Sequence, residues 1–223
     1  MNYGALAGNS HIDARIHEML EDLHQDDALK FVRKFRAERD EQRFHTFREL
    51  IVGSKIRKLM IDTRYEQELA GKTPDWLIKD EAGNVVELVD VFTLHQRRET
   101  ESDMFETIST GAIWTGWVTI PPDHLYAKIE QKANAYAALV RSILRPYTLF
   151  IFGEFAAWVD PEEVEHVLYK HHGGVFLTQP TLASVVYFFE HEGRYLYSFF
   201  SNPEATYTSV LLPRLRGFGT IAA

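Results

Sequence analysis

The chain has no cysteine, which excludes disulfide bonds, thiolate zinc sites and cysteine nucleophiles. Any bound metal must therefore be held by oxygen or imidazole ligands. The sequence also lacks a basic segment followed by an apolar stretch at its start, and it lacks any run of about 18 uncharged apolar residues. We therefore expect a cytoplasmic protein that does not interact with a membrane, in keeping with a reducing compartment.

The chain has no net positive charge, because 32 acidic residues outnumber 24 lysines and arginines. The formal net charge at pH 7 is −8, which is unusual for a protein that binds nucleic acid by neutralising phosphates. The segment 30–58 is the exception, because ten lysines and arginines occur there against four acidic residues. This distribution allows one basic face on an acidic body, but a solvated helix surface is the preferred interpretation.

Apolar residues make up 45% of the 223 positions, which is enough for a buried core. We expect one domain over residues 1–223. Within it, an N-terminal helical extension (1–40) precedes a core (41–153), which a C-terminal helix and hairpin (154–223) extend.

The periodicity of the apolar residues predicts the order of the elements. Steps of three and four residues predict amphipathic helices within 1–40 and a longer helix over 41–61. Three strands joined by turns are expected over 64–69, 73–79 and 85–93. After an irregular segment (95–122), we expect a helix over 123–144, a strand buried on both faces over 147–152, a helix over 161–171, and an aromatic hairpin with strands over 182–189 and 195–200. The hairpin either extends the sheet or forms a subunit contact, and the second case would give a homodimer.

Two acidic residues stand out in the predicted strands. Pro74-Asp75 opens the second strand, and Glu87 interrupts the apolar third strand. Together with the order helix, three strands, helix, strand, this pattern resembles the restriction-endonuclease-like core of the PD-(D/E)xK nuclease superfamily over residues 42–152. The resemblance implies an α/β fold (an α+β sandwich) with an αβββαβ core around a mixed central sheet, extra N-terminal helices, and a C-terminal helix plus β-hairpin.

In that superfamily the two acids share a divalent metal, so the resemblance assigns Asp75 and Glu87 as metal ligands. Their carboxylates suit Mg²⁺, for which Mn²⁺ can substitute, because Mg²⁺ takes oxygen ligands and leaves room for phosphate oxygens. A lysine two residues after the second acid assists the attacking water in the superfamily. Val89 stands at that place in this sequence.

A replacement lysine is expected on the helix over 123–144. Lys132 falls on the apolar stripe of this helix, and Tyr136 follows one turn later. This spacing is similar to the Gln-xxx-Tyr motif of RecB-like members, and displacement of the lysine to this helix also occurs in the superfamily. We therefore predict that Lys132 orients the water or stabilises the phosphorane, with Tyr136 beside it and Lys128 as the reserve candidate.

Further acidic residues remain open to two interpretations. Glu49 matches the place where many members add an acid that binds the metal directly or through water, but an ion pair with a neighbouring arginine or lysine explains it equally well. Asp90 points to the opposite side of its strand from Glu87 by simple alternation. It is either a structural buried acid or, if the register is shifted by one residue, the true ligand. Glu68 and Gln96 are weaker candidates of the same kind.

The ten histidines show no metal-binding spacing such as His-Glu-xx-His. His171-His172, followed by two glycines, invites a metal site, but a turn with exposed imidazoles is the preferred interpretation.

The function predicted from these residues is that of a metal-dependent nuclease, a hydrolase that cuts phosphodiester bonds, and we expect its substrate to be DNA. The alternative is a catalytically inactive binding or scaffold protein with a nuclease fold. The valine at the lysine position would allow such a loss of activity.

Overall fold

A six-stranded mixed sheet, with its strands in sequence order, forms the centre of the molecule. The computed structural model describes residues 10–38, 41–94, 120–153, 159–191 and 193–218. The strands are β1 (Asp62–Tyr65), β2 (Trp76–Lys79), β3 (Val85–Leu94), β4 (Tyr147–Gly153), β5 (Leu182–His191) and β6 (Arg194–Ser201). The first three form the predicted antiparallel meander, β4 runs parallel to both β3 and β5, and β6 returns antiparallel to β5.

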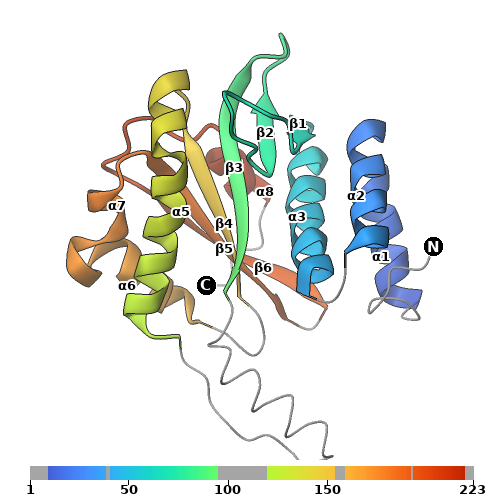
Figure 1. Ribbon diagram of the computed structural model, residues 1–223. Helices are drawn as coiled ribbons and strands as arrows, with labels where there is room; N and C mark the ends of the chain where they lie inside the picture. Colours follow the sequence, from blue (N-terminus) through green and yellow to red (C-terminus); the bar gives the residue numbers. More distant parts are fainter. Residues whose placement is uncertain (1–9, 39–40, 95–119, 154–158, 192, 219–223) are drawn as a thin grey trace, which may run out of the picture.

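Helices cover both faces of the sheet (Figure 1). One face packs against α1 (Ser10–Glu21), α2 (Gln25–Ala37), α3 (Glu41–Lys58) and the short α8 (Leu212–Phe218). The other face packs against α5 (Pro122–Ile143), α6 (Pro161–Tyr169) and α7 (Val175–Thr178). Each face has its own cluster of buried apolar side chains, so the α/β sandwich expected from the sequence is confirmed.

Strand β4 is buried at every position. It has a parallel strand on each side and a helical layer on each face, which explains why its sequence is continuously apolar rather than alternating. The prediction of a strand buried on both faces is therefore confirmed.

Helix α5 begins and ends at residues that favour helix ends in the sequence. Pro122 occupies the first turn, where a missing N–H costs no hydrogen bond. Leu144 takes a left-handed conformation (φ 58°) and ends the helix, and Pro146 prevents its continuation. The predicted bounds agree with the observed ones to within one residue.

Other boundaries differ from the predictions. β1 ends at Tyr65 rather than at residue 69, because Glu66 takes a φ of 43°, outside the β region. β2 begins at Trp76, three residues later than expected. The sequence periodicity gives no sign of α7 or α8, since helices of four and seven residues contain too few positions to show a period.

The aromatic hairpin extends the central sheet, as β5 and β6, which was one of the two predicted roles. Tyr187 and Phe188 are fully buried. The expected homodimer stays a prediction. No helix within the described residues is long and apolar enough to cross a membrane. Gln96 and most of the segment expected to be irregular lie outside the described residues.

Candidate active site

The register between β2 and β3 decides which acid faces Asp75. Trp76 pairs with Val89, so Asp75, the residue before Trp76, lies opposite Asp90. Residues that pair across two strands point to the same face of the sheet. Asp75 and Asp90 therefore share a face, and Glu87 points to the other one.

Asp75 and Asp90 form a close pair of carboxylates where β2 begins. Asp75 Oδ2 accepts a hydrogen bond of 2.6 Å from the backbone N–H of Val91, and Asp90 is only 2% exposed. Burial, followed by the negative charges of Asp90 and Glu49, raises the pKa of Asp75 well above its usual range. Two such acids repel each other unless a proton or a cation lies between them.

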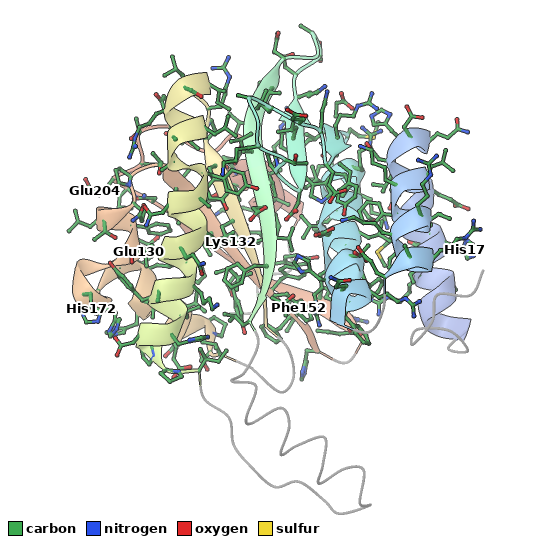
Figure 2. All side chains as sticks on the ribbon, viewed as in Figure 1. His17, Glu130, Lys132, Phe152, His172 and Glu204 are labelled. Carbon is green, nitrogen blue, oxygen red and sulfur yellow. The ribbon has the colours of Figure 1, made fainter. Side chains whose placement is uncertain are left out.

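Helix α5 supplies a lysine and a tyrosine to this pair. Lys132 Nζ donates to Asp90 Oδ2 at 2.7 Å, and Tyr136 Oη donates to Asp90 Oδ1 at 3.3 Å. Lys132 extends from α5 toward β3 (Figure 2). The Tyr136 ring stacks on Tyr147 of β4, with ring centroids 5.0 Å apart, which fixes its position. Lys132 and Tyr136, predicted to act at a site of Asp75 and Glu87, thus lie beside Asp90 instead, and their catalytic roles stay predictions.

The charge state of Lys132 follows from these contacts. Burial lowers the pKa of the ammonium, but the carboxylate of Asp90, with smaller contributions from Asp75 and Glu49, outweighs this and raises the pKa of Lys132 above its usual value. Lys132 therefore stays positively charged at neutral pH. In this state it can donate hydrogen bonds but cannot accept a proton.

Glu49 on α3 lies on the other side of the acid pair. Its carboxylate accepts a hydrogen bond from Tyr65 Oη and lies 3.2 Å from His45 Nε2 and 3.6 Å from Lys34 Nζ. Burial is the largest influence on Glu49. Although Lys34 and Tyr65 oppose it, burial raises the pKa of Glu49 to about 7. The ion pair with a neighbouring lysine, which was the competing interpretation of Glu49, is present, and a role of Glu49 in metal binding stays a prediction.

The backbone around Glu49 is held by Trp76 of β2. Trp76 Nε1 donates to the carbonyl oxygen of Glu49 at 3.0 Å, and the indole ring packs directly against Gly53. A Cβ at residue 53 would lie 1.9 Å from this ring. Gly53 thus allows α3 to approach the sheet closely, and α3 carries Glu49 to a place where its charge influences Asp75.

Several residues of the site are not predicted by the sequence. His45 lies one turn before Glu49, and burial, together with the positive charges of Lys132 and Arg48, lowers its pKa to about 4. Lys34 and Tyr65 reach Glu49 from α2 and β1. The four-residue spacing between His45 and Glu49 is the only sequence signal that could have identified any of them.

We predict that Glu49 makes the fold less stable as pH rises from about 4.5 to about 7. The folded state holds a proton on Glu49 in this window, whereas the unfolded chain has released it, so raising the pH favours unfolding. His45 contributes the opposite slope between about 4 and about 6.5, because only the unfolded chain binds its proton there. In the Glu49→Gln variant the contribution of Glu49 to this slope should disappear, so stability should fall less with rising pH than in the wild type. Denaturation curves of both proteins across this pH range measure the difference, and parallel curves would contradict the raised pKa.

Glu87 lies on the opposite face of β3, fully buried in a cage of donors. Its Oε1 accepts from Ser209 Oγ at 2.6 Å and from Thr148 Oγ1, and its Oε2 accepts from the backbone N–H groups of Val210 and Leu211, both at 2.8 Å. These contacts join β3 to the segment just before α8. Glu87 therefore does not meet Asp75, and the expected pairing is corrected to Asp75 with Asp90.

The remaining candidates lie away from the acid pair. Lys128 is exposed on α5, and Glu68 is exposed beyond β1. Val89 is buried in the core on the α3 side of the sheet. Counted from Asp90, the superfamily's lysine position is held by Phe92, so that position still lacks a lysine.

Four cations of the basic segment 30–58 are engaged in ion pairs within the molecule rather than forming a free patch. The pairs are Lys30 with Asp27 (3.3 Å), Lys34 with Glu66 (2.6 Å), Arg57 with Asp62 (3.4 Å) and Lys58 with Glu18 (3.1 Å). These ion pairs weaken the interpretation of the segment as one basic face on an acidic body.

The donor set fits a hard divalent cation such as Mg²⁺. Asp75 and Asp90 offer carboxylate oxygens from adjacent strands, and a cation there would relieve the repulsion that raises the pKa of Asp75. Within the described part of the chain, the carboxylates of Glu49, Asp75 and Asp90 do not form a set whose oxygens all lie within 4.8 Å of one another.

Comparison with known proteins adds little to this geometry. No protein-family model matches the chain, and no curated protein matches it. A chain in the solved structure of a CdiA-CT/CdiI toxin and immunity complex from Burkholderia pseudomallei is similar to 74% of this chain and 89% of its own length, with 14% identity and a TM-score of 0.41. A similarity this low supports no functional argument, so the site is interpreted from its own residues.

Proposed function

We propose that this chain is a metal-dependent nuclease that hydrolyses phosphodiester bonds in DNA. The supporting observation is the meeting of two carboxylates from adjacent strands, Asp75 and Asp90, with Lys132 and Tyr136 from α5. A cation held by carboxylates beside a fixed ammonium group supports phosphodiester hydrolysis, because negative charge builds up on the phosphate oxygens.

Each side chain has a role that its contacts allow. Asp75 and Asp90 hold Mg²⁺ or Mn²⁺, which when bound lowers the pKa of a water and neutralises charge on the phosphate. Lys132 remains an ammonium group and donates to the attacking water or to a phosphate oxygen. Tyr136 orients Asp90, and Glu49 acts as the auxiliary acid that accepts a hydrogen bond from water. The choice of DNA rests on the resemblance to restriction-endonuclease-like proteins.

Mg²⁺ should bind the wild-type protein and raise its Tm, because an ion that binds the folded state stabilises it by mass action. The Asp75→Asn variant should lose both effects, since the amide carries no charge. Asp80→Asn, the same change in an exposed turn, serves as the matched control and should behave like the wild type. Calorimetric titration and a plasmid nicking assay on the same samples measure binding and cleavage. Metal binding that is equal in all three proteins would contradict the assignment.

An inactive binding or scaffold protein is the second candidate, because Lys132 already neutralises Asp90 and the usual lysine position holds Phe92. In that case nucleic acid, if bound, should bind equally with and without Mg²⁺. A Mg²⁺-dependent affinity that disappears in Asp75→Asn would argue against this candidate.

A further inference from the structure

Two histidines and an aspartate converge away from the acid pair. His171 Nε2 lies 2.7 Å and His172 Nε2 lies 2.8 Å from the same oxygen, Oδ1 of Asp123. The ligand atoms of all three residues lie within 4.8 Å of one another. Asp123 belongs to the first turn of α5, and the histidines belong to the 3-10 turn η3 (His171–Gly173) after α6. Figure 2 shows His172 at the outer edge of this helical layer, well separated from Lys132.

The backbone of the turn presents both imidazoles to the same side. His172 takes a left-handed conformation (φ 51°), and Gly174, with a φ of 88°, leaves the turn beside the end of α6. A Cβ at Gly174 would lie 2.6 Å from the carbonyl oxygen of Leu168, so only glycine fits there. The Tyr126 ring meets both imidazoles edge-on, with ring centroids 6.1 Å from His171 and 5.5 Å from His172.

The arrangement of the three groups is that of metal ligands. Without a cation, both Nε2 atoms must donate a hydrogen bond to the same carboxylate oxygen. Two imidazoles and a carboxylate also suit Zn²⁺ and related transition metals, whereas Mg²⁺ prefers oxygen alone. Ligands of Zn²⁺ lie about 2.0 to 2.2 Å from the ion, so the side chains need to open by only a fraction of an ångström to admit it.

We propose that Asp123, His171 and His172 form a three-ligand site for a divalent transition-metal ion of the zinc class, separate from the acid pair. The side chains of Asp123 and His172 are 76% and 62% exposed, so the fourth coordination position is open to water or to an external ligand. The ion would join the start of α5 to the turn after α6. Its binding should therefore stabilise the packing of these two helices, and it does not depend on nuclease activity.

The acid pair of Asp75 and Asp90 could itself bind Zn²⁺. Zn²⁺ titration therefore distinguishes the proposed site from the acid pair when it is carried out in the Asp75→Asn background. In that background we expect one equivalent of Zn²⁺ to bind and to raise the Tm. Loss of one of the three ligands, in Asp123→Asn or His172→Ala, should weaken the affinity by at least about tenfold. His191→Ala, which removes an exposed histidine of the β5–β6 hairpin, is the control for general surface binding and should bind as its parent does.

Co²⁺ provides a second readout that does not depend on stability. Its visible absorption should show imidazole coordination in the Asp75→Asn parent and should lose that signature in the double variant His171→Ala/His172→Ala. Equal Zn²⁺ affinity in the parent and in the ligand variants, or no binding in the parent, would overturn the proposal. The three groups would then form a hydrogen-bonded cluster only.

Discussion

In the Asp90→Asn variant, Mg²⁺-dependent cleavage of plasmid DNA is expected to fall by at least about a hundredfold, which corresponds to about 2.7 kcal/mol of transition-state stabilisation. Asparagine keeps the shape of the side chain and can still accept a hydrogen bond from Tyr136. It removes the negative charge that holds the cation and fixes Lys132 at 2.7 Å. Single-turnover cleavage rates of the two proteins measure the loss.

Glu87→Gln is the matched control for this prediction, because it removes one negative charge from the same strand but from the opposite face. Its cleavage rate per folded molecule should equal that of the wild type. A normal rate in Asp90→Asn, combined with a large loss in Glu87→Gln, would restore Glu87 as the ligand and reject the register described above.

Glu87→Ala should have the largest effect on stability. Alanine would leave the hydroxyl groups of Thr148 and Ser209 and the N–H groups of Val210 and Leu211 without their common acceptor. Buried donors without a partner are costly, so we expect the free energy of unfolding to fall by about 3 to 4 kcal/mol. Chemical denaturation monitored by circular dichroism measures this change.

Asp75→Asn provides the contrast, since it relieves the repulsion between Asp75 and Asp90 while Val91 keeps its hydrogen-bond acceptor. Its stability in the absence of metal should equal or exceed that of the wild type, as is common when a charged site residue is neutralised. If Glu87→Ala were as stable as the wild type, the buried cage would not be the structural element described above.

The correction from Glu87 to Asp90 has a specific physical cause. Lys79 pairs with Val85, but Ile78 pairs with Glu87, so Val86 is an extra residue in β3. Such a β-bulge shifts the register by one residue. Side chains of β3 beyond the bulge therefore lie on the opposite face of the sheet from the one that a regular hairpin would give them. Without the bulge, a symmetric hairpin would place Asp75 on the face of Glu87, as the sequence pattern suggests. The residues around the turn give no sequence signal that predicts the bulge.

Features carried by long periodic segments could be predicted, whereas those that depend on distant contacts could not. The apolar stripe of α5 was enough to place Lys132 and Tyr136 next to an acid of β3. The cage around Glu87 is formed by Thr148, 61 positions away in the chain, and by residues 122 to 124 positions away, so no local sequence pattern predicts it. The approach of Lys34 to Glu49 likewise depends on how α2 packs against α3.

The most direct test of the account is the position of a bound ion in a crystal of the protein soaked with Mn²⁺. We predict an anomalous difference peak between the carboxylates of Asp75 and Asp90, with Lys132 beside it. A peak at Glu87, or no peak near Asp75 and Asp90 at saturating Mn²⁺, would contradict it.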